Sequence, residues 1–110
     1  MAEINRIRGI VVGQYGEAIQ FTIVDSDGNA VDLSGYNATK TAYLRGPFST
    51  PVKTYTATFV TDGTNGQIKF TPSSGDISVP GDWELQFKLT SASITRYTQV
   101  AIVEVEKALG

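Results

Sequence analysis

The chain has 110 residues with nine basic and eleven acidic side chains, a formal net charge of -2, and neither histidine nor cysteine. This length fits one domain over residues 1–110 that can bury a core without disulfides or metals. No basic block could follow a phosphate backbone, and no apolar run reaches the roughly 18 residues of a membrane span, so neither nucleic acid nor a membrane is an expected partner. We expect no cofactor and no enzymatic activity, because no serine has a visible base to activate it.

Apolar and polar residues alternate over most of the first third of the chain, which predicts strands rather than helices. The first strand is expected at residues 6–12 and the second at residues 17–25. A turn rich in Asp, Gly and Asn follows at residues 25–29, after which Val31 and Leu33 should return as a short partner strand.

The middle of the chain predicts three more strands. The first covers residues 38–45, and its inward face stays open because Ala42 and Leu44 compete with Thr41 and Tyr43. A proline-bounded loop over residues 46–51 leads into the other two, at residues 52–60 and 67–71, which a hairpin loop at residues 62–66 joins. The apolar face of the strand at 52–60 carries Tyr55, Ala57 and Phe59.

The last third has the clearest alternation. Ser73 or Ser74 is expected to cap a single helical turn that places Ile77 under the sheets. The strand at residues 82–90 follows, and then a long last strand at residues 95–106. The core-facing side chains of the strand at 82–90 are Trp83, Leu85, Phe87 and Leu89.

Residues 66–89 read as a short strand, a compact turn and a strongly alternating strand, an order typical of an immunoglobulin-like fold. The predicted fold class is therefore all-β, an immunoglobulin-like antiparallel β-sandwich of about seven to eight strands.

Two segments carry a resemblance to a known family. Residues 16–35 contain an apolar strand, a D-x-D-G-N turn and a V-D-L-S-G exit, and residues 80–87 contain a P-G turn that leads into the tryptophan strand. These segments resemble the immunoglobulin-like domains of tailed-phage virion proteins, especially the N-terminal domain family of upper baseplate proteins. The resemblance implies a non-enzymatic structural protein located in the virion, in the baseplate, tail, neck or capsid-associated, that forms homo-oligomers and contacts other virion proteins.

The two ends of the chain are the expected contact segments. Termini are often disordered unless a partner binds them, so residues 2–8 and 107–110 are predicted to act as arms. Within the first arm, Ile4, Arg6 and Arg8 are the candidate interaction residues.

Three alternative kinds of site remain open. Asp25, Asp27 and Asn29, completed by Asp32, have the spacing of oxygen ligands and give a weak calcium hypothesis, although turn chemistry explains the same residues. Four glutamates, Glu17, Glu84, Glu104 and Glu106, could pair as acid and base for glycoside hydrolysis, but Glu104 and Glu106 share one face of a strand, which favours a solvated face.

The third alternative is a carbohydrate-binding or adhesion module, in which aromatic side chains form a platform for a sugar ring. Tyr36 and Phe48 lie in predicted loops and are the two candidates for exposed contacts, with either a sugar or a protein partner. The other candidate aromatics, expected instead to pack between the sheets, are Tyr43, Tyr55 and Tyr97.

Overall fold

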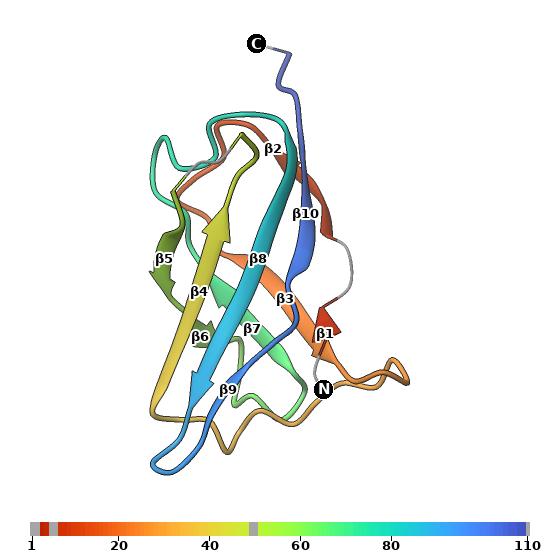
Figure 1. Cartoon of the computed structure of the whole chain (residues 1–110), viewed down its shortest axis with the longest axis vertical. Coiled ribbons are helices and arrows are strands. Elements are labelled where there is room, and N and C mark those ends of the chain that lie inside the picture. Colours follow the sequence, from red (N-terminus) through yellow and green to blue (C-terminus); the bar gives the residue numbers. More distant parts are fainter. Residues whose placement is uncertain (1–2, 5–6, 49–50, 110) are drawn as a thin grey trace.

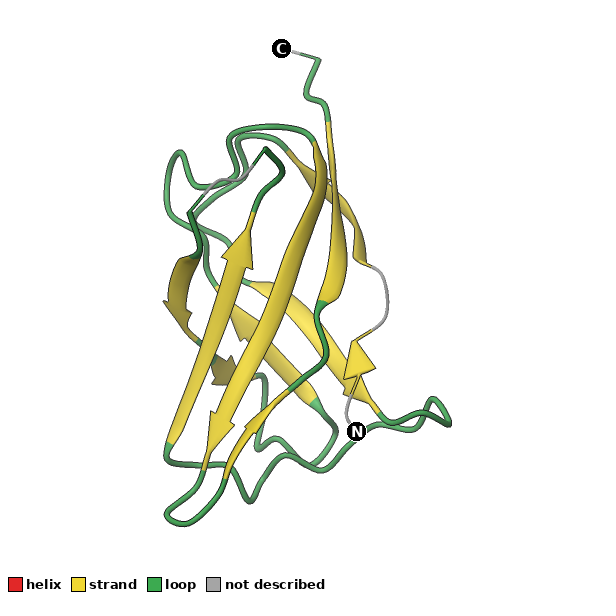
Figure 2. Cartoon of the chain, in the orientation of Figure 1, coloured by secondary structure: helices red, strands yellow, loops and turns green. Residues whose placement is uncertain are grey.

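The computed structural model describes residues 3–4, 7–48 and 51–109, and in this part the chain forms two β-sheets joined by turns and loops, with no helix (Figure 1 and Figure 2). The all-β prediction is therefore confirmed. The strands are β1 (Glu3–Ile4), β2 (Ile7–Val11), β3 (Ile19–Val24), β4 (Thr39–Arg45), β5 (Lys53–Thr56), β6 (Thr58–Phe59), β7 (Gln67–Phe70), β8 (Gly81–Thr90), β9 (Thr95–Tyr97) and β10 (Ala101–Glu106).

The order of the strands is that of an immunoglobulin-like sandwich. The smaller sheet has the order β1-β3-β7-β6, and the larger has the order β2-β10-β8-β4-β5, with β9 also paired to β8. The N-terminal segment contributes to both sheets, because β1 pairs antiparallel with β3 whereas β2 pairs parallel with β10. The predicted antiparallel sandwich is observed, and among the described pairs of strands the contact of β2 with β10 departs from it by being parallel.

The described part of the chain contains ten strands, more than the seven to eight expected. One reason is that residues 52–60 form two strands in different sheets. Ala57 ends the pairing with β4 by donating its N–H to the carbonyl of Lys40 at 2.8 Å, and the next two residues pair with β7. The predicted apolar face survives this change of sheet, since Tyr55, Ala57 and Phe59 all pack on the core.

The expected arm at residues 2–8 is not a free arm where the structure describes it. Ile4 lies in β1 opposite Ile23, and Arg8 lies within β2 in the other sheet. Arg6 lies outside the described residues. Because β1 and β2 belong to the two sheets, removing residues 2–8 would remove strand pairing from the sandwich itself.

Two smaller expectations were wrong. Val31 and Leu33 form no strand: residue 30 makes a single bridge with Val24, and Leu33 is buried as part of a loop. The residues after Pro72 form no helical turn, because Gly75 has a positive φ of 84° in a tight turn that the Asp76 N–H closes by donating to the Ser73 carbonyl at 3.0 Å. The Asp76 carboxylate accepts the Ser73 N–H across the same turn, also at 3.0 Å. Ile77 is nevertheless buried, as expected.

A single core cluster fills the space between the sheets. The Phe21 ring stacks on Phe70 at 5.6 Å and meets the edge of Phe87 at the same distance, so aromatic contacts join the two sheets. On β4 the side chains that face the core are Ala42 and Leu44, and not Thr41 and Tyr43. The buried members of the cluster are Ile10, Phe21, Ile23, Leu33, Ala42, Leu44, Ala57, Ile68, Phe70, Ile77, Trp83, Leu85, Phe87, Leu89, Ala101, Val103 and Val105.

Candidate functional site

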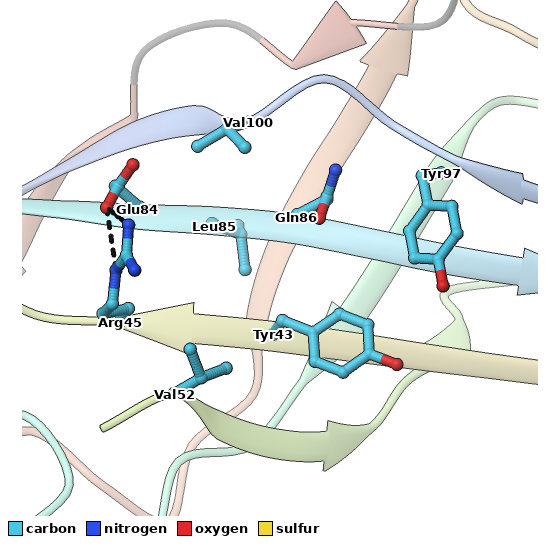
Figure 3. A pocket seen from close by; sticks show the side chains of 8 residues that line it. All are labelled: Tyr43, Arg45, Val52, Glu84, Leu85, Gln86, Tyr97 and Val100. Carbon is cyan, nitrogen blue, oxygen red and sulfur yellow. Dashed lines mark hydrogen bonds and ion pairs between the residues drawn. The ribbon is translucent and has the colours of Figure 1, made fainter. Parts of the chain in front are cut away.

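An open groove lies on the outer face of the larger sheet, over β4 and β8 (Figure 3). Its volume is about 350 Å³. The residues that line it are Tyr43, Arg45, Val52, Glu84, Leu85, Gln86, Tyr97 and Val100. Figure 3 shows Val52 and Val100 on opposite sides of the groove, with the Arg45 and Glu84 pair towards one end and the two tyrosines towards the other.

Strand register places the polar residues of the groove side by side. Antiparallel pairing sets Tyr43 opposite Gln86 and Arg45 opposite Glu84, and paired residues project to the same face of a sheet. Because side chains alternate along each strand, this face is the one that points away from the core. The same alternation that buries Leu44 therefore places these four side chains on the outer face of the sheet.

Arg45 and Glu84 form an ion pair in the groove. The Arg45 Nε donates to Glu84 Oε1 at 2.9 Å, and a second guanidinium nitrogen contacts the same oxygen. The side chains are 49% and 42% exposed, so solvent screens the pair and its contribution to folding is small. Its main effect is to hold two planar polar groups in place at one end of the groove.

Thr98 shapes the other side of the groove through a β-bulge. Tyr97 pairs with Lys88 while Ala101 pairs with Leu85, so the segment from β9 to β10 contains one residue more than the matching stretch of β8. The extra length would leave the Phe87 N–H without a ladder partner, and the buried Thr98 hydroxyl accepts it at 3.0 Å.

The same bulge exposes apolar side chains. The single strand predicted at residues 95–106 is interrupted after Tyr97 and resumes at Ala101. Gln86 Nε2 stabilises this interruption by donating to the Thr98 carbonyl at 2.9 Å. As a result Tyr97 and Val100 are about half exposed. Val52, from the segment before β5, is exposed to a similar degree across the groove.

This arrangement suits contact with a molecule that has both apolar and hydrogen-bonding surface. Tyr43 and Tyr97 offer rings and hydroxyls, and valines line the sides. Gln86 and the Arg45–Glu84 pair offer donors and acceptors without net charge at the groove. Sequence reasoning assigned Tyr43 and Tyr97 to packing between the sheets; Tyr43 instead lies on the outer face, half-buried, and Tyr97 is exposed.

The two loop aromatics that the sequence singled out lie outside the lining of the groove. Tyr36 is half-buried and packs on the core, and its role as a contact residue stays a prediction. Phe48 is 86% exposed and has a positive φ of 63°, a conformation that non-glycine residues adopt at a cost. It lies in the connection after β4, as an exposed loop residue as predicted.

The residues of the calcium hypothesis form turns. Asp25 Oδ1 accepts the N–H groups of Asp27 and Asn29, each at 3.0 Å, and Asp32 Oδ1 accepts the Ser34 N–H at 2.9 Å. Within residues 3–4, 7–48 and 51–109, no group of three or more acidic, histidine or cysteine side chains is arranged to hold a metal ion. The calcium site stays a hypothesis, whereas the turn chemistry predicted for Asp25 is observed.

A polar cluster at the edge of the larger sheet involves Asp76. The Tyr55 hydroxyl donates to Asp76 Oδ2 at 2.7 Å, and Lys53 Nζ lies 3.3 Å from Oδ1. The tyrosine hydrogen bond, with the Ser73 N–H and Lys53, lowers the pKa of Asp76 below its usual 3.8, although burial opposes the shift. Burial and the Asp76 contact raise the pKa of Tyr55. The cluster connects β5 to the segment before β8.

The remaining acidic pair does not form part of the groove. Glu106 is exposed and Glu104 is partly exposed on β10, while Ala101, Val103 and Val105 of the same strand are buried, in agreement with a solvated outer face. No helix in the described residues is long and apolar enough to cross a membrane.

Comparison with known proteins adds no assignment to these features. No protein-family model matches the chain, and no curated protein matches it in sequence.

Proposed function

We propose that this chain is a non-enzymatic structural protein of a phage virion that works through protein–protein contacts. The two segments that resemble phage virion domains, residues 16–35 and 80–87, support the virion part of the proposal. Both segments serve the sandwich, since the first contains β3 with its turn and the second begins β8.

The observation that carries the proposal is the exposed apolar surface on the outer face of the larger sheet. Val52, Tyr97 and Val100 are each about half exposed around one groove, and Tyr43 lies between them. Apolar residues that are exposed singly need no explanation, but several gathered in one groove with polar neighbours mark an interaction site. A sheet face of this kind can bind a flat protein surface.

The test is whether the chain is part of the particle. Phage particles produced from the genome that encodes the chain are purified on a density gradient, and the chain is quantified in the particle fractions by mass spectrometry. We expect it at a fixed copy number relative to other virion proteins, and immunogold labelling shows where it lies. Detection only in the unassembled fraction overturns the virion proposal.

A second candidate function is carbohydrate binding, favoured by the presence of Tyr43 and Tyr97 in the same groove as Arg45, Glu84 and Gln86. Aromatic rings pack on the apolar face of a sugar ring, while planar polar side chains bind its hydroxyl groups. Trp83 is unsuitable as a fluorescence reporter of binding in the groove because its side chain is buried in the core. Phe48 is likewise outside the groove.

Tyrosine fluorescence and a glycan array test this candidate together. Binding through the groove requires that Tyr97→Ala abolishes the signal while Phe48→Ala preserves it. Equal loss in both variants places any sugar elsewhere, and no glycan bound at all leaves the protein contact as the function of the groove.

A further inference from the structure

We propose that two copies of this chain pack against each other through the outer face of the larger sheet, as a symmetric dimer with antiparallel β8 strands. This inference rests on the proposed function, because it names the first partner as a second copy. It follows from three features of that face: the distribution of charge along β8, the position of the groove, and the area available.

Charge is distributed unequally along the outer face of β8. Glu84 and Lys88 lie on this face, two residues on either side of Gln86, which is close to the middle of the strand. Within its own chain, Glu84 is paired with Arg45 through one carboxylate oxygen, Oε1.

A two-fold axis that crosses β8 at Gln86 brings unlike charges together. The axis reverses the strand direction, so Glu84 of one copy faces Lys88 of the other, and the reverse contact forms by symmetry. Each residue lies about 7 Å along the strand from the axis, which is two strand residues. Glu84 of each copy thus lies over Lys88 of the other, whereas a parallel arrangement would place Glu84 over Glu84 and Lys88 over Lys88.

The same axis matches apolar residues. Tyr43 pairs with Gln86 and so lies near the axis, where it meets its symmetry mate. Tyr97 lies beside Lys88, and Val100 lies further along towards the Glu84 end. Reversal therefore places Tyr97 of one copy over the Val100 side of the groove in the other. Each copy offers both the side chain and the groove that receives it.

The area of the face sets the expected strength of the contact. The five neighbouring strands lie about 4.8 Å apart and, with their own lengths at about 3.3 Å per residue, give a face of about 500 Å². A standard specific interface buries about 800 Å² on each partner, so we expect a weak dimer that forms as the concentration rises. The groove on this face has valines on its two sides and the Arg45–Glu84 pair at one end, so it offers both apolar and polar contacts to a second copy.

Charge reversal tests the pairing directly in the full chain. The mass of the purified protein is measured by light scattering and sedimentation over a wide range of concentrations. We expect a dimer of twice 11.8 kDa for the native chain. Glu84→Lys and Lys88→Glu should each raise the dissociation constant by about tenfold or more, because each places like charges opposite one another.

The decisive measurement combines the two variants. In an equimolar mixture, lysines at 84 and 88 of one variant face glutamates at 88 and 84 of the other, so a heterodimer should form although each variant alone is weak. The double variant that carries both reversals should dimerise on its own. A contact elsewhere on the molecule would not give this restoration.

Matched controls keep folding separate from association. Lys69→Glu reverses a charge on the smaller sheet and Glu17→Lys reverses one in a loop, and neither should alter the dimer. Thermal denaturation confirms that every variant folds.

A native chain that stays monomeric at all concentrations overturns the inference, as does a dimer that both reversals leave unchanged. Either result would overturn the dimer without overturning the virion proposal, because the presence of the chain in purified particles is measured in a separate experiment.

Discussion

The inner and outer faces of β8 carry different side chains and serve different parts of the molecule. The inner face presents Trp83, Leu85, Phe87 and Leu89, all of them buried. The outer face presents Glu84, Gln86 and Lys88, which are partly exposed. One strand thus contributes to the core and to the candidate interaction surface by period-two alternation alone.

What differs is how each face depends on its neighbours. The inner face needs only apolar side chains, because burying apolar surface under the opposite sheet stabilises the fold wherever it occurs. The outer groove needs a particular register with β4 and a bulge at Thr98, since these set which side chains stand beside Gln86. Substitutions on the inner face should change stability, and those on the outer face should change association.

The largest expected effect is that of Trp83→Ala on the inner face. It should lower the free energy of unfolding by about 3–5 kcal/mol, because it leaves a cavity in the core. It also removes the indole N–H that donates to the Val79 carbonyl at 3.0 Å. Urea denaturation measures the change, with Gln86→Ala as the control on the outer face. If both substitutions cost the same, the two faces do not differ as described.

An intermediate effect is expected for Thr98→Val, which acts on both faces. The substitution keeps the shape of the side chain but leaves the Phe87 N–H without an acceptor, at a cost of about 1–3 kcal/mol. Loss of this contact should also change the position of Tyr97 in the groove. Hydrogen exchange of the Phe87 amide should speed up in the variant. Unchanged exchange would mean that the bulge does not depend on the hydroxyl.

A smaller effect is expected from acid at the edge of the sheet. The pKa of Asp76 is lower in the folded chain than in the unfolded chain, so its stabilisation is present above the unfolded pKa and is lost as the pH falls through the folded one. Asp76→Asn should lower stability by about 1 kcal/mol near neutral pH and by less in acid. The slope of stability against pH below pH 5 should therefore be shallower in the variant.

The stability of Asp76→Asn must be compared with that of the native chain at each pH. Asp32 and Asp62 also have lowered pKa values, so they too make the fold less stable as the pH falls. These two carboxylates are present in both proteins, so the difference between the curves isolates Asp76. Parallel curves would contradict the role given to the Tyr55 hydrogen bond.

Alternation was sufficient to predict most of the core, including the four buried residues of β8. It could not show that residues 52–60 change sheets, because Tyr55, Ala57 and Phe59 face the same core from either sheet. The register of the N-terminal segment was also beyond prediction, since short consecutive apolar residues fit several pairings.

The groove was missed for a related reason. Tyr43 and Tyr97 were assigned to packing between the sheets, since an aromatic on a strand is more often buried than exposed. The structure shows a change of parity: the inward residues are odd-numbered from Ala101 onward, whereas Thr98, an even-numbered residue, is buried before them. The sequence does not reveal this change, because the buried residue is polar and interrupts the apolar pattern. Such a change within one strand indicates a bulge, and a bulge indicates where side chains are redirected.

The smallest expected effect on stability is that of Arg45→Ala at the end of the groove. The ion pair with Glu84 is about half exposed, so its removal should cost less than about 1 kcal/mol and the difference should shrink further in high salt. Thermal denaturation at low and high salt measures the change in stability. Arg45→Lys is the control variant, because it keeps the charge but lacks the second nitrogen donor of the guanidinium. A cost above about 2 kcal/mol would show that Arg45 supports the fold rather than the groove.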